Sequence, residues 1–135
     1  MATTATSNKT LGQMFGLVFG AIYVLIGLIG FVNDPILGIF NVNALHNIIH
    51  LAVGGLLLYG STRADLAKNI NLLVGVVYAL VALLGFLNII VPDLIDAKGK
   101  GGTADDFLHL GTAILGIYFG TVGGGAVARP TAPAA

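Results

Sequence analysis

A series of long apolar runs constrains this chain more than any other feature of its sequence. The runs cover residues 11–32, 44–60, 70–91 and 104–122. A helix needs about 20 apolar residues to cross the hydrocarbon core of a bilayer. Apolar residues make up 56% of the 135 residues and charged residues only 9%, whereas a soluble domain has about 25% charged residues. The sequence therefore predicts an all-α integral membrane protein with four spans in the lipid bilayer.

Both ends of the chain differ from these runs in composition. Residues 1–10 are small and polar, and residues 126–135 are rich in Ala and Pro, so we predict disordered tails around one transmembrane domain over residues 11–125. The first run is longer than a signal-peptide core of roughly 7–15 residues, which favours a retained helix. The sequence TADD at 103–106 is typical of a capping box and predicts that Thr103 caps the fourth span.

The four runs are related in pairs. The stretch GAIYVLIGLIGFVN at 20–33 matches GVVYALVALLGFLN at 75–88 in seven of fourteen positions without a gap. The stretch HLAVGGLLLY at 50–59 matches HLGTAILGIY at 109–118 in four of ten. The matching order predicts that a helical hairpin has been duplicated. Two hairpins in tandem enter the membrane from the same side, so we expect a parallel repeat about an axis along the membrane normal.

The positive charges predict the orientation of these spans, because cytoplasmic loops carry an excess of Lys and Arg. The side of the expected membrane that holds both termini has four of the six: Lys9, Arg63, Lys68 and Arg129. The other side has only Lys98 and Lys100. The imbalance predicts that both termini lie in the cytoplasm.

All three histidines lie near the start of an apolar run. His46 and His50 are four residues apart, as are Asp105 and His109, so each pair shares one helix face. The alignment of the two repeats pairs His46 with Asp105 and His50 with His109. It also pairs Asn47 with Asp106. The candidate site residues are His46, Asn47, His50, Asp105, Asp106 and His109.

Three interpretations of these residues remain open. His46, His50 and His109 with Asp105 or Asp106 would form a set of three nitrogens and one oxygen that suits zinc or a similar ion. His50 and His109 alone could instead be the axial ligands of a haem. The sequence favours the third interpretation, in which these side chains hydrogen-bond to one another and hold helices together, at about 0.6 kcal/mol for each contact.

Glycines recur every four residues near both ends of the chain. They are Gly12, Gly16 and Gly20 in the first run, and Gly116, Gly120 and Gly124 at the end of the last. Small residues at this spacing let helix backbones approach closely in lipid. The sequence favours packing within the helix bundle and leaves open a homo-oligomer or docking to a larger membrane complex.

The stretches LGIFNVNALHNIIHLAVGG at 37–55 and TADDFLHLG at 103–111 resemble the domain-of-unknown-function 4383 family of small bacterial four-helix membrane proteins. The resemblance covers roughly residues 11–120, although the family often has Asn-Trp where this chain has Asp106-Phe107. It implies four membrane helices in a bacterial inner membrane and no known activity. The family pattern falls on Asn43, His46, Asn47, His50, Asp105 and His109.

The composition also limits the classes of function. The chain has no cysteine and equal numbers of basic and acidic residues, so we expect no thiol chemistry, and no nucleic acid as a partner. With no motif of catalytic residues, the sequence predicts a structural or accessory membrane component without enzymatic activity, such as a subunit of a larger assembly. One alternative is a protein that binds a metal or haem through its histidines. The other is an oligomeric channel or transporter, which is disfavoured because no charge lies deep in the spans.

Overall fold

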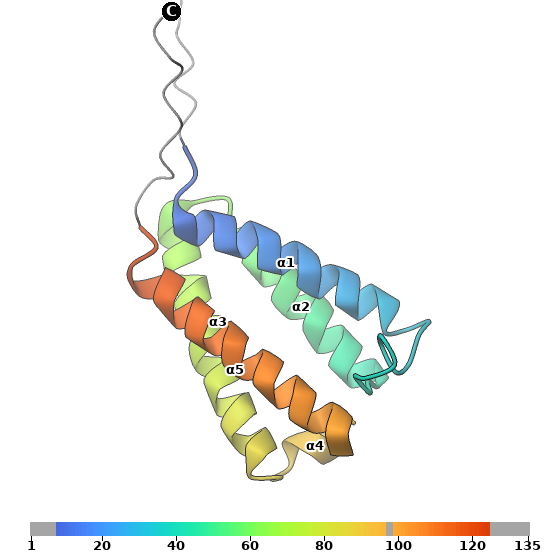
Figure 1. Cartoon of the computed structure of the whole chain (residues 1–135). Helices are drawn as coiled ribbons and strands as arrows, with labels where there is room; N and C mark the ends of the chain where they lie inside the picture. Colours follow the sequence, from blue (N-terminus) through green and yellow to red (C-terminus); the bar gives the residue numbers. More distant parts are fainter. Residues whose placement is uncertain (1–7, 97–98, 125–135) are drawn as a thin grey trace, which may run out of the picture.

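The computed structural model describes residues 8–96 and 99–124 of the chain (Figure 1). Within these residues the protein is all-α and has no strand. Its helices are α1 (Leu11–Ile29), α2 (Ala44–Gly60), α3 (Ala64–Phe86), the single turn α4 (Val91–Leu94) and α5 (Gly99–Thr121). The tails that the sequence predicts to be disordered lie largely outside the described residues, because residues 1–7 and 125–135 are not among them.

The long helices pack mainly in two pairs. Helix α1 lies along α2, and α3 lies along α5, with fewer contacts of α3 to α1 and α2 (Figure 1). Both ends of the described chain lie at one end of the molecule, where Gly12 N donates a hydrogen bond to Gly123 O at 2.8 Å. At the same end the side chain of Gln13 donates to Ser61 O at 3.0 Å, which ties the start of α1 to the turn after α2.

Glycines allow the paired helices to approach closely. A Cβ atom on Gly20 would lie 2.9 Å from Gly54 O of α2, and one on Gly75 would lie 2.5 Å from Ile117 N of α5. Five glycines of the two sequence series lie at such crossings within the chain: Gly12, Gly16, Gly20, Gly116 and Gly120. A Cβ on the sixth, Gly124, would meet nothing within 4 Å. A β-carbon at Gly16, Gly20, Gly116 or Gly120 would therefore push the helices apart, whereas one on Gly12 would make a tight contact of 3.2 Å with Phe119 O.

Two helices begin earlier than the apolar runs suggest. Helix α3 begins at Ala64 rather than at residue 70, and it ends at Phe86 rather than at 91. Its polar first turns are helical because Asp65 suits the positive end of a helix. Helix α5 begins at Gly99, so Thr103 lies inside the helix and is not its cap. Hydropathy predicts only the apolar part of each helix, and both helices extend beyond it into polar sequence.

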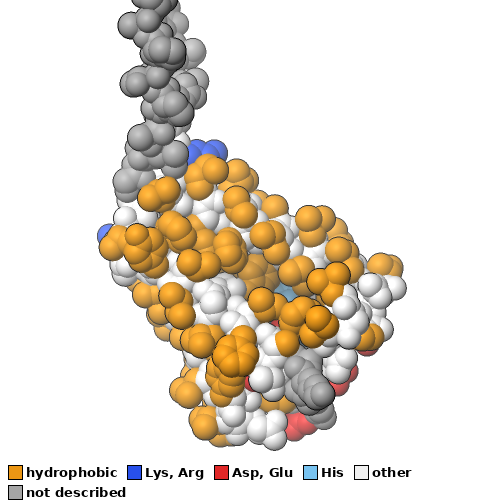
Figure 2. All heavy atoms as spheres, viewed as in Figure 1, with side chains coloured by type: hydrophobic (Ala, Val, Ile, Leu, Met, Phe, Trp, Pro, Cys, Tyr) orange, Lys and Arg blue, Asp and Glu red, His pale blue; other side chains and the backbone are white. Residues whose placement is uncertain are grey.

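Large apolar side chains cover much of the outside of the protein (Figure 2). Helices α1 and α3 are long and apolar enough to cross a membrane. In the most apolar 18-residue stretch of each helix, only 33% is buried within the protein. Helix α2 is also apolar but has 17 residues. The core between the helices is small and contains Phe15, Leu57, Val74 and Ala113 together with two buried tyrosines. Most apolar area of these helices therefore faces outward.

Two adjacent glycines of α2 provide a matched test of the close packing. A Cβ on Gly54 would lie 2.7 Å from Val24 N of α1, whereas a Cβ on Gly55 would meet nothing within 4 Å. We expect Gly54→Ala to lower stability by about 1–3 kcal/mol because the helices must separate. Gly55→Ala should leave stability unchanged or raise it by about 0.5–1 kcal/mol through helix propensity. Melting temperatures in a mild detergent would check this, and equal effects of the two changes would contradict the packing.

Candidate metal centre

The site begins at the first turn of α2. Asn43 is the N-cap of this helix, and its side-chain oxygen accepts a hydrogen bond from His46 N at 2.8 Å. The amide of the same side chain donates to Leu94 O at 2.9 Å, which ties the start of α2 to α4. The cap fixes where α2 begins, so His46 and, one turn later, His50 project from the same face of the helix.

A backbone carbonyl orients the ring of His46. Its Nδ1 lies 3.1 Å from Ile95 O, and because a carbonyl oxygen can only accept, Nδ1 carries the hydrogen. In the neutral ring Nε2 therefore presents a lone pair. His46 is 2% exposed, and Nε2 has no hydrogen-bond partner among the described residues. Histidines that bind metals are commonly held in this way, with one nitrogen donating to a carbonyl and the other free to coordinate.

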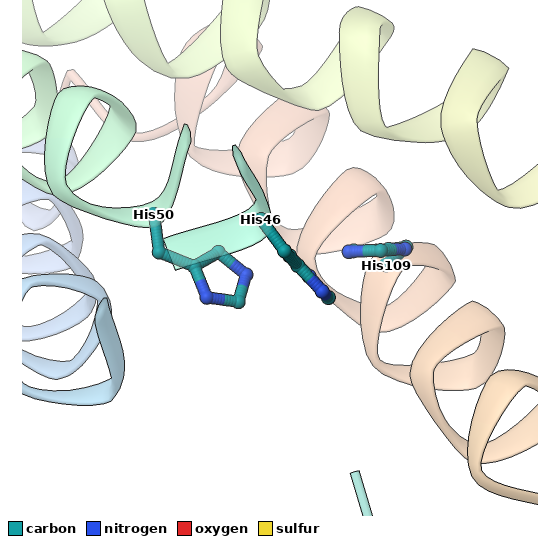
Figure 3. Close-up of side chains that lie close together, drawn as sticks. All are labelled: His46, His50 and His109. Carbon is teal, nitrogen blue, oxygen red and sulfur yellow. The ribbon is translucent and has the colours of Figure 1, made fainter. Parts of the chain in front are cut away.

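The other two histidines complete a group around this nitrogen. One ring nitrogen from each of His46, His50 and His109 lies within 4.8 Å of the other two. In Figure 3 the ring of His46 lies between that of His50, from the same helix α2, and that of His109, from α5. The Nδ1 atoms of His50 and His109 are buried, and neither has a hydrogen-bond partner in the described part of the chain. Two helices far apart in sequence thus place three imidazoles together.

Asp105 adds a carboxylate to the three imidazoles. Its Oδ2 lies 3.8 Å from His46 Nε2 and 3.6 Å from His109 Nδ1. This oxygen is also buried and unpaired within the residues that the structure describes. The result is a buried group of three nitrogens and one oxygen. We name it the His/Asp cluster, and its members are His46, His50, Asp105 and His109.

Two tyrosines wall the cluster on the side of α1 and α3. The ring of Tyr23 meets His50 edge to face at 5.1 Å, and the ring of Tyr78 meets His109 in the same way at 5.1 Å. The two tyrosines also contact each other, with ring centroids 5.5 Å apart. Edge-to-face packing fixes ring planes, so the tyrosines hold the imidazoles in orientation and exclude water from this side.

The other two candidate residues lie away from the cluster. The side chain of Asn47 lies against Gly30, and that of Asp106 lies against Gly85, each where a β-carbon would collide with it. Both are buried, at 2% and 6% exposure. They fill equivalent places between helices, and Asp105 rather than Asp106 is the acid beside the histidines.

The geometry favours a metal ion over a haem. The ring centroid of His46 lies 4.4 Å from that of His50 and 6.1 Å from that of His109. His46 thus fills the space between the two rings that a haem would need as axial ligands on opposite faces of its macrocycle. A single ion requires no such space, and it can bond to all three rings.

Some residues of the site could not be identified from the sequence. Ile95 acts through its backbone carbonyl, which any residue supplies, so no side-chain pattern marks it. Tyr23 and Tyr78 do carry a signal, because they are identical residues at matching positions of the aligned stretches 20–33 and 75–88.

The chain matches the family described as domain of unknown function 4383 (DUF4383) over residues 13–122, and it belongs to this family. The matched region contains the whole His/Asp cluster and both tyrosines. No curated protein and no solved structure matches the chain.

A double-mutant cycle tests whether His50 and His109 share one site. In buffer that contains zinc, His50→Ala and His109→Ala should each lower the free energy of unfolding by about 1–3 kcal/mol. The double variant should cost less than the sum, with a coupling of about 0.5–3 kcal/mol. Unfolding by titration with a denaturing detergent would measure these energies. The pair of His50→Ala with Thr62→Ala, at the opposite end of α2, is the control and should be additive; additivity of the two histidines would disprove a shared site.

Proposed function

We propose that this protein is a multi-pass protein of the bacterial cell membrane that holds one divalent metal ion of the zinc class in its His/Asp cluster. The ion would lie inside a four-helix bundle made by duplication of a hairpin. The observation that carries the proposal is that one ring nitrogen from each of the three buried histidines lies within 4.8 Å of the other two, beside the buried carboxylate of Asp105. The proposed role is binding rather than catalysis, and it suits a structural or accessory component of the membrane.

The apolar exterior supports the membrane location. Soluble monomers rarely expose contiguous apolar patches of more than a few hundred Å², yet apolar side chains cover much of the face seen in Figure 2. Residues such as Leu25 and Leu80 are more than half exposed on the two helices long enough to span a membrane. A core helix of a soluble protein would be mostly buried, and these helices are not. Lipid is the surrounding that makes this surface favourable.

Equivalent contacts in the two helix pairs support the duplication. Three kinds of contact between the first pair of helices recur at matching positions in the second. The contact of Gly20 with Leu58 corresponds to that of Gly75 with Ile117, and the contact of Gly30 with Asn47 corresponds to that of Gly85 with Asp106. The contact of Tyr23 with His50 corresponds to that of Tyr78 with His109. Two apolar sequences can resemble each other by chance, whereas the same contacts at matching positions of two helix pairs are less easily explained by chance.

The charges at the two ends support an orientation with both termini in the cytoplasm. Lys9 and Arg63 lie at the end that holds both ends of the described chain, where Lys9 Nζ donates to Ser61 O at 3.4 Å. Asp34 and Asp93 lie in the connections at the other end. Basic and acidic atoms are likewise separated on the face in Figure 2. Lys and Arg are enriched in cytoplasmic loops, so the cluster would lie in the outer half of the membrane.

The energy of burial supports an ion at the cluster. Each buried polar group without a partner costs about 1–3 kcal/mol, and three such atoms meet here: His46 Nε2, Asp105 Oδ2 and His109 Nδ1. A cation can satisfy all three at once. Zinc bonds of about 2.0–2.1 Å place ligand atoms about 3.3 Å apart in a tetrahedron, and Asp105 Oδ2 already lies 3.6 Å and 3.8 Å from two of the nitrogens. The three ring nitrogens lie within 4.8 Å of one another, so side-chain rotations that bring them closer would be needed to close the site.

The ligand types support a zinc-class ion among divalent cations. Imidazole suits zinc, copper, iron and nickel, whereas calcium takes six to eight oxygens and magnesium usually keeps several waters. The proposed ion would bond His46 and His50 of α2 to His109 of α5. It would thereby join the two helix pairs across the centre of the molecule.

Metal analysis tests the proposal directly. Protein purified in a mild detergent from medium with zinc should hold one ion per chain, and a chelator should lower its melting temperature. His109→Ala should lose the ion, and Asp105→Asn should weaken its binding by about 10- to 100-fold or more, the range seen when groups around a metal are changed. Asp106→Asn is the matched control and should keep the ion. Wild-type protein without metal and without a thermal response to zinc would refute the site.

Accessibility of single cysteines tests the orientation. The chain has no native cysteine, so Val32→Cys and Thr62→Cys each carry one thiol, at opposite ends of the molecule. In spheroplasts of a bacterial host, a reagent that does not cross membranes should label Val32→Cys at once and Thr62→Cys only after lysis. The reverse pattern would invert the protein, and labelling of both in intact spheroplasts would contradict the membrane location.

A further inference from the structure

A polar pocket lies at the end of the molecule opposite the two ends of the described chain (Figure 1). It is formed by the end of α3, by α4 and by the first turns of α5, and it has a volume of about 230 Å³. Its accessible surface is mostly polar, and Asn88, Thr103 and Asp106 are among the residues that line it. The volume corresponds to about seven water molecules at ~30 Å³ each, which is enough for an ion that keeps its waters.

Asp106 places a carboxylate in the wall of this pocket. The residue is only 6% exposed, and no hydrogen bond or ion pair joins its side chain to another residue that the structure describes. A buried carboxylate is unfavourable unless it is paired. A cation in the pocket would therefore stabilise Asp106.

The elements that border the pocket also form the His/Asp cluster. Asp106 follows Asp105 on α5, and the two carboxylates are close enough for their negative charges to repel each other. Pro92 of α4 lines the pocket, and Ile95, just after α4, provides the carbonyl that orients His46. One step along α5 and one short turn of the chain thus connect the polar pocket with the cluster.

A second pocket approaches the cluster from the side, but it is unsuited to an ion. It has a volume of about 330 Å³, and its accessible surface is almost entirely apolar. The ring nitrogens and the carboxylate oxygen of the cluster that lack partners are buried behind it. An ion on this route would lose its waters without gaining polar contacts, which is costly. We name this space the apolar pocket.

The charges of the chain favour cations at the end that has the polar pocket. Five of the six acidic residues lie toward this end, and they are Asp34, Asp93, Asp96, Asp105 and Asp106. Only two of the six basic residues, Lys98 and Lys100, belong to the same part of the sequence. A cleft with an excess of negative charge raises the local concentration of cations and the rate at which they associate.

We propose that divalent cations reach the His/Asp cluster through the polar pocket and that Asp106 is the residue that binds them first. This entry site rests on the proposed metal site, because the cluster is where the ion ends. An ion that passes from the carboxylate of Asp106 to that of Asp105 exchanges its waters for protein ligands in steps. Stepwise exchange avoids a bare charge in an apolar interior, so Asp106 sets the rates of loading and release, whereas the cluster holds the bound ion.

Rates of zinc exchange on the full-length protein in a non-ionic detergent test the proposal. Metal analysis first establishes that each variant holds zinc when zinc is in excess. A zinc-sensitive indicator then follows uptake by the metal-free protein. Asp106→Asn keeps the shape of the side chain and removes its charge, so uptake should slow at least about tenfold while the zinc held at saturation stays the same. Added salt should slow uptake by the wild type more than uptake by this variant.

Release of zinc separates a residue on the route from one that only attracts the ion. Zinc-loaded protein is mixed with an excess of chelator, and the indicator follows the loss of the ion. If Asp106 binds the ion on its way, Asp106→Asn should slow release as well, because the ion leaves by the route through which it enters. Loss of a charge that only attracts the bound ion would speed release, and that result would overturn the entry site.

Two control variants address the charge and the route. Asp34 is an exposed acid at the same end, lines neither pocket, and accepts a hydrogen bond from Val42 N at 3.1 Å that an amide oxygen can keep. Its charge is screened by solvent, so Asp34→Asn should change uptake by less than about twofold. Ile22 lines the apolar pocket and is 43% exposed, so Ile22→Trp should obstruct that pocket and leave both rates unchanged.

The outcomes separate the entry site from the metal site. A wild-type protein that holds no zinc refutes the metal site itself. Equal rates for Asp106→Asn and Asp34→Asn in proteins that hold zinc overturn the entry site and leave the metal site intact. Slower uptake by Ile22→Trp would place the route in the apolar pocket and overturn the entry site in the same way. Loss of zinc at saturation from Asp106→Asn would make Asp106 a ligand of the bound ion and contradict its role in entry.

Discussion

The close approach of backbones at glycines is the constraint on which the rest of the structure depends. In lipid, apolar side chains gain little by meeting each other rather than acyl chains, so helix association relies on packing and on hydrogen bonds. The crossing of Gly20 with Gly54 and that of Gly75 with Ile117 bring α1 onto α2 and α3 onto α5. The distances at these crossings leave no room for a β-carbon. The helices can therefore turn defined faces inward although most of their surface is equally apolar.

Two further glycines determine which polar residues reach the centre. Gly30 and Gly85 receive the side chains of Asn47 and Asp106 between helices. On a helix, adjacent residues project about 100° apart, so when Asn47 occupies the space beside α1 its neighbour His46 turns toward the middle of the molecule. The same relation on α5 turns Asp105 toward the middle when Asp106 faces α3. The small residues of one helix thus select the ligand atoms that the next helix presents.

Much of the site follows from spacing, and part of it does not. The four-residue spacing of His46 with His50 and of Asp105 with His109 predicts shared helix faces, and the structure brings the four side chains to one place. The choice between Asp105 and Asp106 depends on the rotation of α5, which the glycine at 85 sets from a distant part of the sequence. The position of the Ile95 carbonyl depends on how the connecting segments fold. Turn residues such as Asn88 and Ile90 have positive φ angles that apolar periodicity does not predict. Hydropathy did not predict the early starts of α3 and α5, because the first turns of both helices have polar sequences.

The proposed duplication explains why the cluster has an uneven set of ligands. A perfect repeat would place either four imidazoles or two imidazoles and two carboxylates about the axis, because His46 and Asp105 occupy matching positions. Four imidazoles would leave a bound divalent ion with both of its charges unbalanced in an apolar interior, and two carboxylates would neutralise it. The difference at this one position gives three nitrogens and one oxygen, which would leave a bound divalent ion with a single net positive charge. One difference between the two proposed halves would thus complete the metal site and also halve the charge that the apolar interior has to accommodate.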